Sequence, residues 1–336
     1  MAKSIGSDFE IGFGNFFHRK RNNLLKKSIL LSSGRDCIYY ILKSLNLKSR
    51  VLLPSYLCNS MLVPFDELGV KYDFYNVDEN LNIDITDLKK KIEKNTECVF
   101  VIHYFGVEQP KIRDIKEICE KNNIKLVEDQ VQSFLSSYPN VGNYVFNSYR
   151  KFLPVPDGAF LLGEFERKVK LSKSPKYVFK RFFGGLLKNF KFLKSYWRKI
   201  FIESEETYID SYSRPAKMSN ISKYLLNKLN FREIINIRRR NYLYLASKLE
   251  SKLLYPNISK SVCPLGCPIL VENRDEVRNF LISNKIYPPV HWDLPEEVKE
   301  FEDSYSISKR ILTIPIDQRY NLKDMKRIVR VLNEIN

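Results

Sequence analysis

The sequence lacks the features that would assign it to a membrane or to a secreted class. No apolar run reaches the roughly 18 residues that a membrane-spanning helix needs, although 44% of the residues are apolar. The start of the chain also lacks the apolar core that follows an early positive charge in a signal peptide. These absences predict a folded cytoplasmic protein.

Cysteine is sparse and widely spaced. The six cysteines lie at positions 37, 58, 98, 119, 263 and 267. The one close pair, Cys263 and Cys267, has no histidine nearby, and the whole chain has only three histidines. Metal-binding proteins usually combine these residue types at short spacing, so we expect reduced thiols and predict no metal site.

Acidic residues are absent from residues 167–202. This stretch carries twelve Lys or Arg and nine aromatic residues, so the rest of the chain has a net charge of only +5 against +17 for the whole. One interpretation is a pair of surface helices with inward-packed aromatics and solvated lysines. The alternative is a surface for an anionic membrane, a phosphate-bearing ligand or RNA. Because no nucleic-acid-binding motif occurs elsewhere, we predict no nucleic-acid partner.

Short apolar runs alternate with segments of helical spacing from residue 28 onward. This order is typical of a parallel sheet covered by helices, and therefore of the α/β class. We expect a large domain over residues 1–215, with 167–202 as a basic aromatic helical insertion. Residues 216–336 are expected to form a helix pair and a smaller α+β domain.

Asp129 follows the apolar run of IKLVED, where a buried strand should end. Ligands of open parallel sheets bind beyond the carboxyl ends of strands, although an Asp there can also be a helix N-cap. Gln132 comes three residues later, and its amide can meet a ring oxygen or lie in an exposed loop.

Two further segments contain phosphate-binding chemistry. In NSYRKFLPVPDGAF, the hydroxyl of Ser148 can hold a phosphate while the amine of Lys151 bonds to an aldehyde. In SSGRDCIYY, Gly34 and Arg35 open a helix directly after a strand, where free N–H groups and the positive helix end attract phosphate. An ordinary helix start capped by Ser33 is the alternative.

The order of these motifs resembles that of the DegT/DnrJ type sugar aminotransferases, which are fold-type-I pyridoxal-phosphate enzymes. SSGRDCIYY is similar to the family's Gly-Thr helix, LVEDQVQS to its Glu-Asp-x-x-Gln motif, and VHWDLP to its C-terminal substrate segment. The resemblance covers roughly residues 28–334. It implies a mostly parallel central sheet flanked by helices, with a smaller C-terminal α+β lobe.

The resemblance also implies a role for each residue of the motifs. Lys151 would hold the cofactor covalently and move the substrate proton, and Asp129 would pair with the pyridine nitrogen. The other implied cofactor contacts are Gln132, Ser148, Gly34, Arg35, Tyr56 and His103. Tyr56 is included because Cys58 stands where an aromatic often covers the ring, and a core position is the alternative for His103.

Three residues are implied as substrate contacts: His291, Trp292 and Lys217. The function implied is pyridoxal-phosphate-dependent transfer of an amino group from an amino acid, glutamate, to a nucleotide-linked keto-sugar for a surface polysaccharide. A homodimer is expected because family active sites combine residues of two subunits. The alternatives are a small phosphorylated ketone as acceptor, or a non-catalytic homologue that binds a nucleotide-sugar, or a membrane through residues 167–202.

Overall fold

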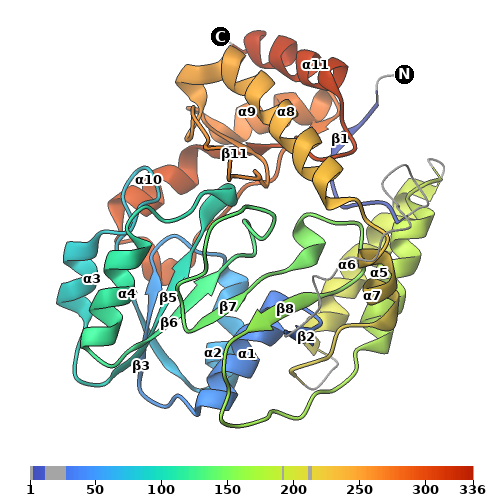
Figure 1. The fold of residues 1–336 in the computed structure, drawn as a ribbon. Coiled ribbons are helices and arrows are strands. Elements are labelled where there is room, and N and C mark those ends of the chain that lie inside the picture. Colours follow the sequence, from blue (N-terminus) through green and yellow to red (C-terminus); the bar gives the residue numbers. More distant parts are fainter. Residues whose placement is uncertain (1–2, 12–27, 191–192, 211–213, 336) are drawn as a thin grey trace.

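The computed structural model describes residues 3–11, 28–190, 193–210 and 214–335. Two lobes stand one above the other in Figure 1, with a pair of helices projecting from the side of the larger lobe. In the described ranges, no helix is long and apolar enough to cross a bilayer.

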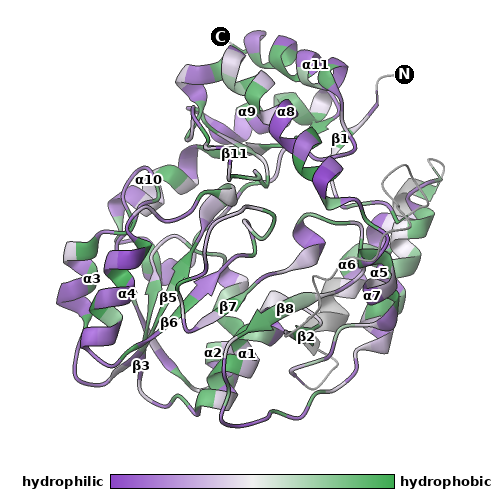
Figure 2. Cartoon of the chain, in the orientation of Figure 1, coloured by the Kyte–Doolittle hydropathy of each residue, from purple (hydrophilic) through white to green (hydrophobic). Residues whose placement is uncertain are grey.

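A seven-stranded sheet forms the centre of the larger lobe. Its strands, in spatial order, are β2 (Ile29–Leu31), β8 (Ala159–Leu162), β7 (Tyr144–Phe146), β6 (Lys125–Asp129), β5 (Thr96–Ile102), β3 (Arg50–Pro54) and β4 (Lys71–Tyr75). All neighbouring pairs are parallel except the two that β8 makes. Figure 2 shows apolar residues along these strands, as expected for a sheet buried on both faces.

Helices pack on this sheet through apolar stripes. They are α1 (Gly34–Leu45), α2 (Val63–Leu68), α3 (Ile85–Lys91) and α4 (Ile112–Lys121). In α4, Ile112, Ile115 and Cys119 are buried at helical spacing, while its charged residues face outward. The predicted α/β fold, a mostly parallel sheet flanked by helices, is confirmed.

The smaller lobe is built mainly from the C-terminal third of the chain. It contains α8 (Phe231–Leu249), β9 (Cys267–Leu270), α9 (Arg274–Ser283), β10 (Ile286–Tyr287), β11 (Ile311–Ile314) and α11 (Leu322–Asn333). Helix α10 (Glu302–Arg310) packs on the larger lobe, since its Ile307 lies in the core of that lobe. Strand β9 pairs with β11. The N-terminal strand β1 (Ile5–Gly6) pairs with β10, so the start of the chain also lies in this lobe.

The basic stretch forms the projecting helix pair α5 (Pro175–Leu187) and α6 (Lys194–Asp210), beside α7 (Asn220–Leu226). The expected inward packing holds for Tyr177, Trp197 and Phe201, which are buried. It is wrong for Phe179 and Tyr196, which are 66% and 64% exposed. Two antiparallel helices bury one stripe each, so aromatics off those stripes stay in solvent.

Candidate functional site

The carboxyl ends of β2 and β6 meet at an inner pocket of the larger lobe. Asp129 is the last residue of β6, and Gly34 opens α1 directly after β2. Ser148 precedes a short 3-10 helix, Tyr149–Lys151, that carries the lysine. The pocket wall includes Gly34, Arg35, Asp129, Gln132, Ser148, Lys151, His291 and Trp292, together with Cys58 and Ser60. Residues widely separated in the sequence therefore share one cavity.

Asp129 is the buried acid of this pocket. Its Oδ1 accepts a hydrogen bond from the Val131 N–H at 2.7 Å. Its Oδ2 accepts none from the residues that the structure describes. Burial raises the pKa of the carboxyl to about 7, against the opposing effects of the Val131 N–H and the positive charge of Lys151. The carboxylate therefore lacks a full set of partners and is suited to a cationic or N–H group from a ligand.

The neighbouring acid, Glu128, points to the other face of the strand. It pairs with His103 at 2.8 Å and accepts the N–H of Val141. His103 is fully buried, and its Nδ1 accepts the N–H of Gln109, so both ring nitrogens are engaged within the protein. His103 does not line the pocket. It thus occupies the alternative position, that of a core histidine, outside the pocket that Asp129 and Lys151 line.

The start of α1 is both a capped helix start and a candidate phosphate site, the two interpretations of SSGRDCIYY. Ser33 caps the helix by accepting the Asp36 N–H at 3.2 Å. The N–H of Gly34 makes no hydrogen bond to any described residue and lies at the positive end of the helix. A Cβ at Gly34 would come within 3.2 Å of the Val131 side chain, so glycine keeps the backbone open to the pocket here.

The side-chain amide of Gln132 is bound to the protein through its oxygen, and the residue lines the pocket. Its Oε1 accepts the Phe105 N–H at 2.8 Å. Its Nε2 has no hydrogen-bond partner in the described part of the chain. The amide is thereby held in one orientation, with its donor end available to an acceptor in the pocket.

His291 and Trp292 close the pocket from the smaller lobe. Burial, reinforced by the positive charge of Lys151, lowers the pKa of His291 to about 3, so its ring is neutral. The His291 Nδ1 lies 2.9 Å from Thr313 Oγ1. Tyr56 does not line the pocket; it is fully buried and its hydroxyl binds the backbone of His291 and Trp292. Tyr56 therefore supports the two residues, and the side chains of Cys58 and Trp292 form the wall where Tyr56 was expected.

Lys217 lies outside this pocket. It is exposed beside Leu31, with which it forms an isolated bridge, and it contributes to neither cavity around Lys151. The structure of one chain thus does not bring Lys217 together with the other expected site residues.

An outer cavity of about 620 Å³ opens from the inner pocket. The two share Lys151, His291, Arg35 and Arg150 in their walls. The outer wall contains two acids, Asp8 and Asp317. Its basic residues are Arg35, Arg150, Lys151, Arg181, Arg238, Arg278 and Arg319. A cavity of this size and charge suits an anionic ligand larger than the inner pocket can hold.

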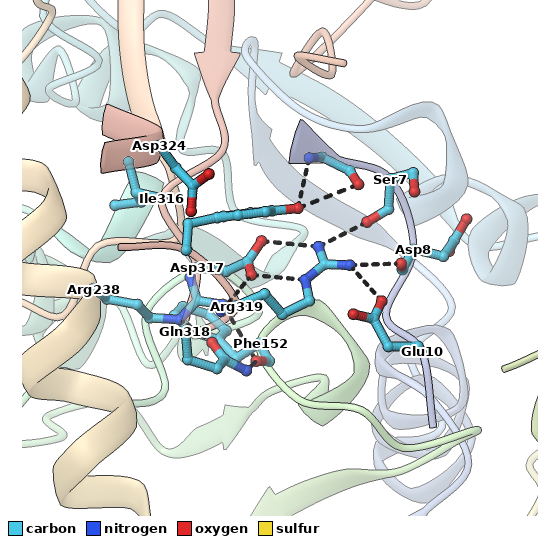
Figure 3. Close-up of polar contacts among 12 residues, drawn as sticks. Ser7, Asp8, Glu10, Phe152, Arg238, Ile316, Asp317, Gln318, Arg319 and Asp324 are labelled. Atoms are coloured by element: carbon cyan, nitrogen blue, oxygen red, sulfur yellow. Dashed lines mark hydrogen bonds and ion pairs between the residues drawn. The ribbon is translucent and has the colours of Figure 1, made fainter. Parts of the chain in front are cut away.

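Arg238 holds the turn that carries the lysine. Its Nη2 donates to the carbonyl of Phe152, the residue after Lys151, and the Gln318 amide donates to the same oxygen at 2.8 Å. Figure 3 shows Arg238, Gln318 and Phe152 together. Sequence reasoning missed Arg238, although helical spacing places it on the buried face of α8 with Ile234.

A second arginine fixes the N-terminal segment over the outer cavity. Arg319 pairs with Asp317 at 2.8 Å and with Glu10 at 3.0 Å, and donates to the carbonyls of Ser7 and Asp8. Figure 3 shows its guanidinium between Asp317 and this segment. Residues 7–10 are thereby held to the smaller lobe as part of the cavity wall.

Comparisons with known proteins agree with this architecture. Residues 7–151 match the model of the DegT/DnrJ/EryC1/StrS aminotransferase family, which confirms the resemblance over this part of the chain. A GDP-perosamine synthase from Vibrio cholerae is 23% identical over 124 residues, which are 36% of this chain and 32% of that protein. The chain thus spans about a third of the length of that curated relative.

Solved structures resemble the chain over nearly its whole length. PseC of Helicobacter pylori, an aminotransferase of pseudoaminic acid biosynthesis, has a TM-score of 0.71 at 12% identity, with 99% of each chain covered. The PLP-form of the putative sugar aminotransferase Spr1654 from Streptococcus pneumoniae has a TM-score of 0.71 at 13% identity, covering 99% of this chain and 100% of that one. A DegT DnrJ EryC1 StrS aminotransferase from Brucella abortus has a TM-score of 0.67 at 18% identity, covering 91% and 85%. These likenesses show the fold.

Proposed function

We propose that this chain, a member of the DegT/DnrJ/EryC1/StrS aminotransferase family by its residues 7–151, is a pyridoxal-phosphate-dependent aminotransferase. It would transfer the amino group of an amino acid, glutamate, to a keto-sugar. The observation that carries this proposal is that Lys151 and the buried carboxyl of Asp129 line the same inner pocket. An amine and a carboxylate in one cavity can bind opposite ends of a pyridoxal ring.

The residues of the inner pocket fit this cofactor. The Oδ2 of Asp129, which accepts no hydrogen bond from the described residues, would be an acceptor for the pyridine N–H, and the Nε2 of Gln132 would be a donor for the ring oxygen. The open N–H of Gly34, at the positive end of α1, suits the phosphate. Ser148 and Arg35 line the same pocket and are proposed as further phosphate contacts.

Pyridoxal phosphate, when bound, supplies a carbonyl carbon that takes up the amino group and a ring that accepts the electrons of a neighbouring carbanion. Lys151 would anchor the cofactor and then remove and return the proton at the reacting carbon. Asp129, in its ionised form, would keep the pyridine nitrogen protonated. Trp292 and Cys58 would exclude water from the reacting atoms.

The outer cavity supports a phosphate-bearing acceptor. Seven basic and two acidic residues line it, and it adjoins Lys151. A nucleotide-linked keto-sugar carries a diphosphate that such a wall attracts, and its sugar would reach Lys151 past His291 and Trp292. We propose this acceptor class, with a surface polysaccharide as the destination of the product.

A homodimer is part of this proposal. Lys217 is exposed and lies outside the pockets of its own chain. It would contact the substrate in the second copy's site, because family active sites combine residues of two subunits. Light scattering of the purified protein tests the dimer, and Lys217→Ala should weaken acceptor binding without lowering the stability of the subunit.

The visible absorbance spectrum of the purified protein with pyridoxal phosphate tests the function. We expect a band of the lysine-bound cofactor that disappears on addition of glutamate and is absent from Lys151→Ala. Lys168→Ala is the matched control, because Lys168 is an exposed lysine outside both cavities. A protein that never takes up the cofactor would contradict the proposal and favour a non-catalytic nucleotide-sugar-binding homologue.

A glutamate-bleached protein can then be offered a panel of acceptors. Return of the original band identifies the acceptor that has taken the amino group. Recovery with nucleotide-linked keto-sugars supports the proposed substrate class. Recovery only with small phosphorylated ketones would replace it.

A further inference from the structure

Arg278 is a half-buried cation in the wall of the outer cavity. It lies on α9, one turn after Arg274. Its Nε donates to the carbonyl of Pro288 at 3.3 Å. Across the described ranges its guanidinium has no other hydrogen bond and no ion pair within 4 Å. Asp275 on the same helix pairs with Arg274 at 2.9 Å and attracts Arg278 only at longer range.

Three other arginines of this cavity are already engaged within the protein. Arg181 pairs with Asp8 at 3.2 Å, and Arg319 pairs with Asp317 and Glu10. Arg238 is buried and bonded to three backbone carbonyls and the Gln318 amide. Arg278 thus differs from them, because no residue in the described ranges occupies either of its Nη groups.

Tyr287 directly precedes Pro288, whose carbonyl accepts the hydrogen bond from Arg278. It lines the same cavity, and its hydroxyl has no hydrogen bond to any residue that the structure describes. Pairing of β10 with β1 fixes its backbone opposite Gly6. A Cβ on Gly6 would overlap the Tyr287 carbonyl, so this close pairing depends on glycine.

Both residues lie away from the proposed cofactor. Arg278 and Tyr287 line only the outer cavity, whereas Asp129 and Gln132 line only the inner pocket. Lys151 lines both. A ligand that places its carbonyl carbon at Lys151 and contacts Arg278 must therefore extend out of the inner pocket.

We propose that Arg278 and Tyr287 form a subsite for a phosphate group of the acceptor. This inference rests on the proposed function and names the residues that would select a phosphorylated acceptor. A guanidinium whose two Nη groups have no partner among the described residues can bind two phosphate oxygens at once, and a phenol adds a third donor. The amino donor is short and reacts at Lys151, so its carboxylates stay nearer the inner pocket.

Calorimetric binding of UDP, GDP and inorganic pyrophosphate to the cofactor-loaded protein tests the subsite. We expect Arg278→Gln to weaken binding of these probes about 10- to 100-fold, the loss of charge-assisted hydrogen bonds. Arg278→Lys should restore part of the affinity, because it returns the charge without the fork. Tyr287→Phe should weaken binding about 3- to 10-fold.

Arg330→Gln is the matched control. It removes the same charge from the same lobe, but Arg330 is exposed on α11 and pairs with Glu334. Probe affinity should be unchanged in this variant. An equal loss in both variants would overturn the subsite in favour of a general effect of net charge.

The glutamate half-reaction separates the donor from the acceptor. Arg278→Gln could slow bleaching by glutamate as much as it weakens pyrophosphate binding, or slow bleaching without weakening pyrophosphate binding. In either case Arg278 serves the donor carboxylate and the proposal is wrong. Absence of binding to the unmutated protein would also refute it. If the protein shows no cofactor band but pyrophosphate binding still depends on Arg278, the subsite stands and the aminotransferase proposal fails.

Discussion

Replacement of Asp129 by Asn should stabilise the cofactor-free protein at neutral pH while removing its activity. In the folded protein, burial raises the pKa of Asp129 to about 7, whereas an Asp in the unfolded chain has a pKa of about 3.9. Asn keeps an oxygen for the Val131 N–H and carries no charge. The variant therefore removes the cost of holding an ionised carboxylate in this pocket.

The sign and size of the effect follow from proton linkage. Between about pH 4 and 7 the unfolded carboxyl is ionised while the folded one keeps its proton. The folded state then binds more protons, so its stability falls as the pH rises through this window. A difference of about 3 pKa units corresponds to on the order of 4 kcal/mol, present in full as a destabilisation above pH 7 and absent below pH 4.

Urea unfolding of both proteins from pH 4 to 8 measures this effect. The difference in unfolding free energy between Asp129→Asn and the unmutated protein should grow by about 1.4 kcal/mol per pH unit and level off near pH 7. Other titrating groups are shared by the two proteins and cancel in the difference. A difference that stays constant across this range would refute the reasoning.

Urea unfolding in the presence of pyridoxal phosphate provides a second test of the Asp129 carboxyl. A protonated pyridine nitrogen beside Oδ2 would favour the ionised carboxylate, so the pH-dependent loss of stability should shrink in the unmutated protein. Asp129→Asn should bind the cofactor without this change. It should also fail to bleach with glutamate, because the ring nitrogen is no longer kept protonated.

Three further substitutions test the packing around the site. Arg238→Met should lower the unfolding free energy in urea by about 3 kcal/mol, since buried carbonyls lose their donors. Arg319→Gln should speed proteolysis in the N-terminal segment that includes Glu10, at a cost of about 1 to 2 kcal/mol in stability. Gly106→Ala should cost about 2 kcal/mol or more by thermal unfolding, because its φ is +99° and a Cβ would overlap the Cys263 carbonyl.

The alternation of apolar runs and helical segments was enough to predict the sheet. IKLVED became β6, which ends at Asp129 as expected. The predictions depended only on local spacing and on the burial of parallel strands on both faces. Helix α10 was not predicted, because its sequence, EDSYSISKR, has few apolar residues to mark a period.

Site residues that end the parallel strands β6 and β7, or follow them within a few positions, were located from the sequence. Asp129, Gln132, Ser148 and Lys151 all line the inner pocket, since parallel strands bring their carboxyl ends to one edge. Tyr56, by contrast, was expected to cover the pocket and lies buried behind it. Side-chain direction after a strand depends on the turn that follows, and local spacing does not specify that turn.

The sequence by itself determined the fold class and the group of residues at the sheet edge, because the alternation of strands and helices along the chain, and the strand ends, follow from local hydrophobic patterns. The order of the strands within the sheet came from the tertiary structure. Only the tertiary structure decided which charged side chains are already paired within the protein and which can bind a ligand. The sequence does not distinguish the three arginines. In the structure Arg238 is buried against backbone carbonyls, Arg278 lacks an ion pair among the described residues, and Arg319 pairs with two carboxylates. Those differences come from contacts between segments up to about 300 residues apart, and long-range packing alone sets them.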